Sequence, residues 1–348
     1  MEQVTTVGID LAKRVFHVCG RDAAGRVILE RRFSRAGLQA FMAALAPAVV
    51  GLEACGGAHD WGRRLRALGH EVRLMHPARV AAYVGAHKND RADARAICEA
   101  AGRPAVRSIP VKTVDQQALQ ALHRLRGGLV KERTAAINRM RGILQEFGVT
   151  LPKGRAAFLR RYPDLAAMGR LDELPAVLVD ELDAAFAALA AASRRIAKVE
   201  GKILALARAD VRARRLMEVE GIGRIGASAL VAAVDDARAF RNGRAFAAWL
   251  GLVPRQRSTG GTPRLLGISK RGDSHIRLCL VHGARAVLTA LRRRGPRTPL
   301  ERWAAAKADT MHPNKLAVAV ANKLARYAWV IMARDQPYRP KQLTSKAA

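Results

Sequence analysis

The sequence predicts a mixed α/β domain at the N-terminus, followed by two long helices and a mostly helical C-terminal region. Residues 4–34 hold three short apolar segments separated by turn residues, after which helical and strand patterns alternate. Apolar residues recur at helical spacing over 114–147 and 178–206, and glycines punctuate the chain from about residue 211. We therefore expect domains over 1–112, 113–210 and 211–335, with a basic, flexible tail over 336–348.

The N-terminal elements are those of a mixed sheet with helices packed on it. Three strands come first, and the turn residues Arg21–Gly25 suit a hairpin between the second and the third. The expected strands cover 4–12, 14–22, 26–34, 48–54 and 71–77, and the expected helices 35–46, 59–69 and 90–100. Bound ligands are then expected at the strand ends.

The apolar residues between 178 and 206 alternate steps of four and three, as in a heptad repeat. They are Leu178, Leu182, Ala185, Leu189, Ala192, Ile196, Val199, Ile203 and Leu206. A proline-bearing connector over 151–165 joins this helix to the one expected over 114–147. The two helices can pair with each other or with a second copy of the chain. We favour the second arrangement, and therefore a homo-oligomer, either a dimer or a tetramer.

The net charge indicates the kind of partner. The chain has 348 residues, of which 61 are Lys or Arg and 29 are Asp or Glu, so that its net charge is +32. Half of the residues are hydrophobic, which places this charge on folded surfaces. Such surfaces attract polyanions, because each phosphate that they neutralise releases counterions. We expect nucleic acid as the partner. Ribosomal and histone-like proteins are as basic, but they are rarely as long or as hydrophobic.

Cysteine usage and apolar runs exclude several classes of protein. The four cysteines are far apart in the sequence and form no C-x-x-C pair, which argues against a zinc site and a disulfide framework. No basic flank followed by an apolar stretch opens the chain, so no signal peptide is visible. The longest uncharged run, 36–52, contains Gln39 and Pro47 and is interpreted as a helix and a buried strand. A cytoplasmic protein without membrane contacts is expected.

Four carboxylates mark a candidate metal site. Asp10 ends the first strand, Glu53 ends the strand at 48–54, and Asp90 and Asp93 lie three apart on one helix and share a face. Together they repel one another unless divalent cations lie between them, and Mg²⁺ prefers such hard oxygen ligands. Two ions about 4 Å apart can stabilise the attacking and leaving oxygens of a phosphodiester. Mg²⁺ or Mn²⁺ is the expected cofactor, and the nucleic-acid backbone is expected on Lys88, Arg91 and Arg95.

Each of these acids also has an ordinary explanation. An Asp at a strand end is usually a turn or cap residue, and D-x-x-D on a basic helix usually forms surface salt bridges. The combination favours the metal site, because the order D, E, D-x-x-D falls on two strand ends and a helix.

Residues 254–273 carry a second chemistry. Ser258 and Thr259 precede Gly260 and Gly261, whose backbone N–H groups can approach a phosphate. Surrounding cations lower the cost of an attacking alkoxide. These cations are Arg255, Arg257, Arg264, Lys270 and Arg271. From the residues alone, we favour a phosphate-binding loop in which Ser258 only donates a hydrogen bond.

Taken together, the motifs resemble those of the DEDD insertion-sequence transposases, the bridge-RNA-guided recombinases. The similarity rests on VGIDLAKRVFHVC, GLEACGGAHDW, KNDRADARAI, GIGRIGASAL, AAWLGLVPRQRSTGG and LLGISKRGDSHIR, and it extends to about residue 335. It implies a ribonuclease H-like N-terminal domain of the RuvC type and a C-terminal transposase domain, in which 221–230 resemble a helix-hairpin-helix motif. A tight connection between two helices gives the same glycine pattern.

The resemblance also implies roles for individual residues. Asp10, Glu53, Asp90 and Asp93 become the DEDD set, and Ser258 becomes a nucleophile that forms a phosphoserine link to DNA. Thr259 and Ser269 are less favoured substitutes for Ser258.

The expected function is that of a bacterial insertion-sequence transposase or recombinase, associated with the nucleoid when it acts. The resemblance implies a structured guide RNA that pairs with donor and target DNA, so that base pairing supplies sequence choice. It also implies that the acidic and serine centres meet across protomers rather than within one chain. Two other functions fit the residues. One is a metal-dependent Holliday-junction resolvase or nuclease without a covalent intermediate, and the other is a non-catalytic nucleic-acid-binding protein with salt-bridged acids.

Overall fold

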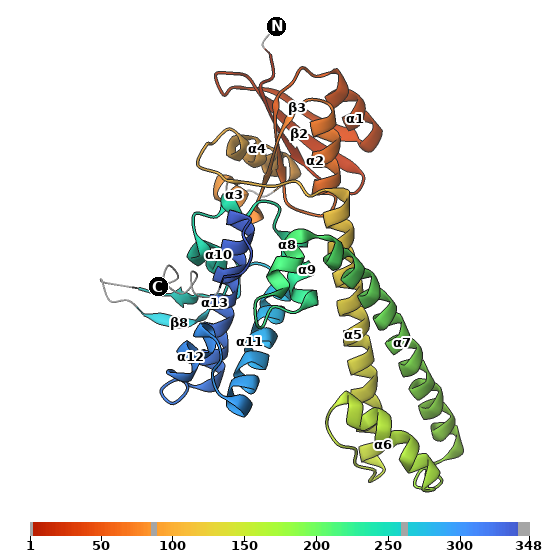
Figure 1. The fold of residues 1–348 in the computed structure, drawn as a ribbon. Helices are drawn as coiled ribbons and strands as arrows, with labels where there is room; N and C mark the ends of the chain where they lie inside the picture. The colour runs from red at the N-terminus through yellow and green to blue at the C-terminus, as the bar shows by residue number, and fades with distance from the viewer. Residues whose placement is uncertain (1–2, 85–88, 259–263, 340–348) are drawn as a thin grey trace. The chain divides into compact units, whose positions relative to one another are not determined.

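The chain divides into two compact units, Met1–Val114 and Asp115–Ala348. The computed structural model describes residues 3–84, 89–258 and 264–339 (Figure 1). Within these residues, the first unit is a sheet with helices packed on it, and the second consists of helices and one short hairpin.

Six strands of the first unit form one mixed sheet in the order β3-β2-β1-β4-β5-β6. The strands are β1 (Thr6–Asp10), β2 (Val15–Arg21), β3 (Val27–Ser34), β4 (Val49–Glu53), β5 (Glu71–Met75) and β6 (Ser108–Ile109). The first three are antiparallel neighbours, β4 and β5 run parallel to β1, and β6 pairs antiparallel with β5. This sheet is consistent with a ribonuclease H-like fold, and it confirms the expected mixed α/β class. The two-residue strand β6 was not predicted.

Helices cover both faces of this sheet. The predicted helices α1 (Arg35–Ala44) and α2 (Ala58–Ala67) bury Leu38, Met42, Trp61 and Leu65 against one face. The predicted helix α4 (Asp90–Ala101) packs against β1, β2 and β4 and buries Ala94, Ile97 and Cys98. Two short turns of helix, α3 (Pro77–Val80) and η1 (Ala81–Tyr83), follow β5 and were not predicted.

Two glycines let α4 lie unusually close to the sheet. A Cβ atom on Gly8 of β1 would overlap the backbone of Ala94 and Cys98 in α4. A Cβ atom on Gly51 of β4 would lie 2.6 Å from the Cβ of Ala101. Real Cβ atoms do not approach other atoms so closely, so glycine is required at both positions for this packing. The helix axis is thereby fixed against the two central strands.

The second unit begins with two long antiparallel helices, α5 (Val114–Glu146) and α7 (Ala176–Ala209) (Figure 1). Arg126 Nε donates to Glu200 Oε1 at 2.6 Å, and one heptad further along Arg133 Nη1 donates to Ser193 Oγ at 3.4 Å. Both predicted helices are confirmed, and they pair within the chain. Pairing with a second copy stays a prediction.

Of the apolar positions in the heptad repeat of α7, alternate ones are buried. Leu182, Leu189, Ile196 and Ile203 are buried at steps of seven residues. The alternate residues are half-buried or exposed, namely Leu178, Ala185, Ala192, Val199 and Leu206. The expected connector is wrong in one respect, because residues Arg155–Ala167 form helix α6, which continues through Pro163. Phe158, Tyr162 and Leu165 bury one face of α6, and this burial outweighs the hydrogen bond lost at the proline.

The C-terminal part of this unit is mostly helical, as predicted. It contains α8 (Val211–Met217), α9 (Arg224–Ala233), η2 (Ala237–Ala239), α10 (Gly243–Trp249), α11 (Ser274–Arg294), α12 (Pro299–Ala305) and α13 (Pro313–Arg334). The hairpin β7 (Pro254–Gln256) and β8 (Leu265–Ile268) was not predicted. Among the described helices, α13 is long and apolar enough to cross a membrane, but half of its apolar window is buried in the protein core.

The turn between α8 and α9 carries the glycines of the GIGRIG motif. Gly221 has φ +88°, and a Cβ atom there would lie 2.9 Å from Val287 in α11. Its carbonyl oxygen rests against Gly283, where a side chain would collide with it. The two short helices with a glycine turn fit the expected motif, and this turn is packed tightly on α11.

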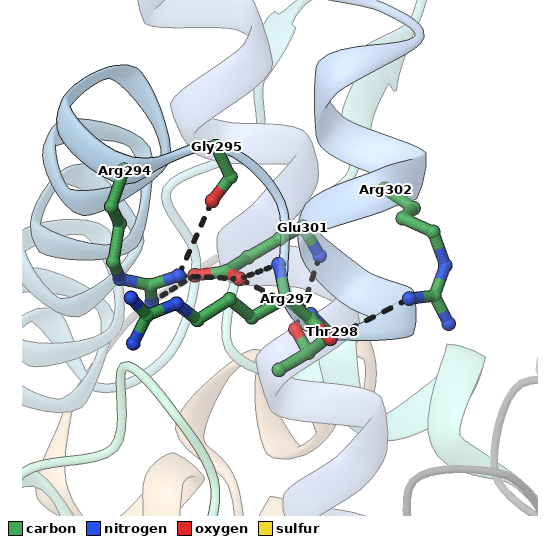
Figure 2. A network of polar contacts seen from close by, with 6 residues as sticks. All are labelled: Arg294, Gly295, Arg297, Thr298, Glu301 and Arg302. Atoms are coloured by element: carbon green, nitrogen blue, oxygen red, sulfur yellow. Dashed lines mark hydrogen bonds and ion pairs between the residues drawn. The ribbon is translucent and has the colours of Figure 1, made fainter.

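A buried carboxylate organises the loop between α11 and α12. Figure 2 shows Glu301, which is 1% exposed, between the side chain of Arg294 and the backbone of Arg297 and Thr298. Arg294 donates to both carboxylate oxygens at 2.7 and 3.2 Å, and the N–H groups of Arg297 and Thr298 donate at 2.8 and 3.2 Å. Burial alone would raise the pKa of Glu301, but these bonds outweigh it and hold the pKa below its usual value.

A buried histidine, His123, and a half-buried one, His275, join α5 to the C-terminal helices. His123 Nε2 lies 3.0 Å from Ser228 Oγ of α9, and its Nδ1 lies 3.2 Å from His275 Nε2 of α11. Burial, reinforced by His275 and Arg126, lowers the pKa of His123 to about 4. Burial also lowers the pKa of His275. The His123 ring is therefore neutral at pH 7.

The close packing of α4 leads to a first prediction. Gly8→Ala is expected to lower the free energy of unfolding by about 3 kcal/mol, because the new methyl group must displace helix backbone. Urea denaturation followed by circular dichroism measures this change. Gly56→Ala is the control, because its added Cβ atom meets nothing within 4 Å. An equally stable Gly8→Ala protein would show that α4 is not held this close to β1.

The histidine pair leads to a prediction about pH. The pKa of an unfolded histidine is near 6.5, whereas the pKa of His123 in the folded chain is about 4. Between these pH values, the unfolded chain therefore binds more protons than the folded chain. The stability that neutral His123 contributes is present above pH 6.5 and is lost as the pH falls toward 4, by up to about 3 kcal/mol. His123→Gln should therefore lose less stability than wild type between pH 7.5 and 4.5 in thermal melts. His312→Asn, which keeps a side-chain cap, should behave as wild type, and equal slopes for all three proteins would refute the assignment.

Candidate active site

Asp10 and Glu53 lie side by side at one edge of the sheet. β1 and β4 are parallel and pair in the register Ile9 to Leu52, so the next residue of each strand is an acid. Each strand buries its three central residues and leaves the terminal carboxylate partly exposed. The strand burial thus delivers both carboxylates to the carboxyl ends of neighbouring strands, as predicted from the sequence.

The other two acids come from the start of α4. Asn89 caps this helix, with its side-chain oxygen accepting from Ala92 N at 2.9 Å, and Asp90 and Asp93 occupy the first turn. Carboxylates are stabilised at a helix N-terminus by its partial positive charge. Because α4 is held against β1 and β4 at Gly8 and Gly51, its first turn is brought toward the strand ends.

The electrostatics of Asp10 show that the four acids are neighbours. Burial raises the pKa of Asp10 above its usual value, and the charges of Asp93, Asp90 and Glu53 raise it further. His17, the partner of Asp10 in the β1–β2 register, opposes this rise. Its Nε2 lies 3.5 Å from Asp90 Oδ2. Negative charge therefore predominates among the described groups that act on Asp10.

The donor set fits a hard divalent cation in its chemistry. All four candidates are carboxylates, whose hard oxygen atoms are the ligands that Mg²⁺ prefers. The side chains do not enclose an ion as they are placed. In the described part of the chain, no group of three or more His, Cys, Asp or Glu residues is arranged to hold a metal. The acids therefore gather at one edge without converging on a point.

Two of the expected backbone-binding cations are engaged within the protein. Arg91 Nε and Arg95 Nη2 each donate to Glu30 Oε2 of β3 at 2.9 Å. Hydrogen bonds from Arg95 and Arg91 lower the pKa of Glu30 to about 2. Both arginines remain exposed at the surface, so they can still face a nucleic acid. Lys88, the third expected cation, lies outside the described residues.

Ser258 follows the first strand of the β7–β8 hairpin and is exposed. Its hydroxyl oxygen accepts a hydrogen bond from Gln256 Nε2 at 2.8 Å. The backbone of the hairpin closes at Arg257, whose N–H donates to Arg264 O at 2.9 Å. In the described residues, no His, Asp or Glu hydrogen-bonds to Ser258.

The base of the hairpin is fixed by close backbone contacts. Gly251 and Gly272 have φ +72° and +75°. A Cβ atom on Gly251 would overlap the backbone of Arg271, and a Cβ atom on Gly272 would overlap the backbone of Trp249. The hairpin therefore leaves the core at a defined point. The described cations expected here are all exposed and form no ion pair with a described carboxylate, namely Arg255, Arg257, Arg264, Lys270 and Arg271. Thr259, Gly260 and Gly261 lie outside the described residues.

Sequence reasoning missed three residues of these sites. His17 could have been found, because the expected hairpin places it opposite Asp10. Glu30 carried no signal, since it is more than sixty residues from Arg91 and Arg95. Gln256 lies within the expected motif, but an amide beside a serine has no distinctive pattern.

The comparison with known proteins identifies the chain. Residues 213–298 match the Transposase IS116/IS110/IS902 family, and residues 7–149 match a family described as Transposase, DEDD_Tnp_IS110. A Pseudomonas aeruginosa protein described as "Probable family 20 transposase" is 47% identical over 344 residues, covering 97% of this chain and 99% of the relative. The chain belongs to the IS110/IS116 family of insertion-sequence transposases.

Two further relatives of this transposase carry insertion-sequence names. The transposase for insertion sequence element IS1328 of Yersinia enterocolitica is 41% identical over 331 residues, which is 95% of this chain and 97% of the relative. The transposase for insertion sequence element IS1111A of Coxiella burnetii is 39% identical over 339 residues, which is 97% of this chain and 92% of the relative. The expected enzyme class is confirmed. The DEDD segment covers Asp10, Glu53, Asp90 and Asp93, and the second segment covers Ser258.

The raised pKa of Asp10 makes a prediction about metal binding. A carboxyl whose folded pKa is raised contributes stability that is present at low pH and is lost as the pH rises through that pKa. At pH 7 in EDTA, Asp10→Asn should therefore be more stable than wild type, by about 1 kcal/mol or less after solvent screening. Mg²⁺ should raise the melting temperature of wild type but not that of Asp10→Asn.

Asp60→Asn is the matched control, because Asp60 is an exposed acid already paired with Arg64 at 2.9 Å. This variant should keep the full response to Mg²⁺. An equal response of Asp10→Asn and wild type would place the metal elsewhere.

Proposed function

We propose that this transposase cuts and exchanges DNA strands through a covalent link at Ser258, assisted by a divalent metal at Asp10, Glu53, Asp90 and Asp93. The observation that carries this proposal is the gathering of the four carboxylates at one sheet edge, where burial and then the charges of the other three raise the pKa of Asp10. Such uncompensated negative charge is expected where cations bind. Its occurrence in the DEDD segment of a transposase supports a role in the reaction.

The serine step exchanges one phosphate ester for another. The Ser258 oxygen attacks a backbone phosphorus, the new serine O–P bond forms, and the bond to the deoxyribose oxygen breaks. The hydroxyl proton of Ser258 passes to water, and the released deoxyribose oxygen takes up a proton. In the joining step, a deoxyribose hydroxyl of another strand loses its proton to water and attacks the phosphoserine phosphorus. The new deoxyribose O–P bond forms, the serine O–P bond breaks, and the Ser258 oxygen takes up a proton. The phosphodiester energy is conserved, so no external energy source is needed.

The residues of the hairpin have complementary tasks in this reaction. The amide of Gln256 donates to Ser258 and orients its oxygen. Exposed Arg255, Arg257 and Arg264 can neutralise the phosphate that Ser258 attacks. A bound Mg²⁺ pair would act as a Lewis acid toward the developing charge on the phosphate oxygens. The acids that hold it belong to the same chain or to a partner copy, and we favour the partner.

We further propose that a structured RNA guides the choice of donor and target DNA. Its support is the net charge of +32, which exceeds what one short DNA contact requires, together with the resemblance described above. Base pairing would then read the sequence, while the protein grips phosphates and performs the chemistry. The work would take place in the bacterial cytoplasm, by a dimer or tetramer.

Trapping of the covalent intermediate tests the serine mechanism. Wild-type protein, with Mg²⁺ and with RNA transcribed from the element's noncoding DNA, should yield a protein–DNA adduct that survives denaturation. Ser258→Ala should abolish the adduct and lower strand exchange at least about 1000-fold, because the attacking atom is gone. Gln256→Ala should lower the rate less, since the nucleophile remains.

The control reactions separate the competing functions. Cleavage without an adduct, retained in Ser258→Ala, would indicate a metal-dependent junction nuclease. Activity that is unchanged in Asp10→Asn and in EDTA would remove the acids from the chemistry. A reaction that proceeds equally well without RNA would refute guidance while leaving the serine mechanism intact.

A further inference from the structure

Four cations from three segments gather around the middle of α13. They are Lys323 and Arg326 of α13, Arg244 of α10, and Lys307, which follows α12. We refer to these four residues as the α13 cation cluster. In the described part of the chain, none of the four forms an ion pair with a carboxylate. The cluster lies outside every motif that the sequence indicated.

Aromatic and backbone contacts fix the cluster in place. The ring of Trp303 lies beneath two of its members, with Lys323 Nζ at 4.4 Å and Lys307 Nζ at 5.9 Å from the ring centroid. Gly243 brings α10 against α13, because a Cβ atom there would lie 3.2 Å from the Cα of Arg326. Arg244, the next residue, is thereby held near Arg326. The cluster is thus built into the fold rather than formed by free surface chains.

The arrangement is unfavourable without an added anion. Burial lowers the pKa of Lys323, and the charges of Arg326 and Lys307 lower it further. Burial and the charge of Arg244 do the same for Arg326. Elsewhere the chain supplies a carboxylate to a cation, as Glu301 does for Arg294 (Figure 2). Cations near a helix C-terminus are stabilised by the helix dipole, but Lys323 is in the middle of α13.

The helix that carries the cluster contacts the segment that leads into the hairpin of Ser258. Asn322, the neighbour of Lys323, donates from its side-chain nitrogen to Leu252 O at 3.1 Å. Strand β7 begins two residues later, at Pro254. Helix α10, which supplies Arg244, ends at Trp249, just before the same segment. An anion bound at the cluster therefore lies near the base of the serine hairpin.

We propose that the α13 cation cluster binds backbone phosphates of the DNA strand that is presented to Ser258. This inference rests on the proposed function, since it assigns the strand to the serine hairpin. The phosphate group fits because it needs no sequence-specific partner and relieves the repulsion among the four cations. Lys323 and Arg326 are three residues apart on one face of α13, so they can contact successive phosphates of one DNA strand.

The test is the salt dependence of DNA binding by Lys323→Gln/Arg326→Gln. Glutamine keeps the carbon stems, including those that pack against Gly243, and removes only the charges. Binding of the full-length protein to a fluorescein-labelled, mixed-sequence DNA duplex is followed by anisotropy between 0.05 and 0.3 M salt, roughly the range in which phosphate contacts dominate. We expect the plot of log K for DNA binding against log salt concentration to become less steep, by about 2 in slope. We expect the affinity for DNA at 0.1 M salt to fall on the order of tenfold for each lost phosphate contact.

Three controls make the result specific. Lys323→Arg/Arg326→Lys keeps the charges and should keep the wild-type slope. Lys198→Gln/Lys202→Gln removes the same charge from exposed positions on α7 and should change the slope less. The melting temperature of the glutamine variant should not fall, because like charges have been removed. A structural role would instead lower it.

Several outcomes would overturn the inference. These are an unchanged slope, an equal loss in the α7 control, or a lowered melting temperature with no rescue by the charge-preserving variant. Weakened binding to an RNA hairpin with unchanged binding to DNA would also overturn it. The assay involves no strand cleavage, so it gives its answer even if Ser258 is not the nucleophile. A missing adduct with a lowered slope would refute the serine mechanism alone.

Discussion

The close contact between α4 and the two central strands is the constraint on which the acidic centre depends. Gly8 and Gly51 bring the helix backbone onto β1 and β4, and the same strands end in Asp10 and Glu53. The separation of Asp90 and Asp93 from these acids is therefore set by packing in the core rather than by the acids themselves. A site assembled this way tolerates repulsion among its carboxylates, because apolar burial holds the elements together.

Charges in this transposase fall into two groups. Glu30 is neutralised by Arg91 and Arg95, and Glu301 by Arg294 and two backbone N–H groups. The carboxylates around Asp10, the arginines of the serine hairpin and the α13 cation cluster lack such balance among the described residues. The first group stabilises loops and helix ends. The second group coincides with the places where we propose that a metal ion or a phosphate binds, because perturbed charged groups cluster at functional sites.

The N-terminal fold and its acids could be predicted because burial leaves a clear pattern in the sequence. β1 and β4 are covered on both faces, so each is a short apolar run that stops at a carboxylate. Asp10 and Glu53 end neighbouring strands and Asp90 and Asp93 begin a helix, as the sequence predicted, and their role as one metal site stays a proposal. Whether they close around a metal could not be predicted, because that depends on side-chain positions, and as placed they do not enclose one.

Other elements left little or misleading pattern. The β7–β8 hairpin is three to four residues per strand and largely exposed, with Leu265 66% exposed, so no alternation marks it. Helix α6 was hidden by Pro163, which usually ends a helix. The contacts of Glu30 and of the α13 cation cluster join residues far apart in sequence. Their partners become visible only when the helices are packed.

The regular spacing of buried residues along α7 has a consequence for how this protein can change over evolution. Its buried side chains toward α5 recur every seven residues, at Leu182, Leu189, Ile196 and Ile203. An insertion of two or five residues would rotate the distal half of the helix and turn its apolar stripe away from α5. Matched additions of seven residues to both helices would preserve every contact on either side. The paired helices can therefore act as a spacer whose length is adjustable in discrete steps, leaving the hairpin and the helices beyond it unaltered.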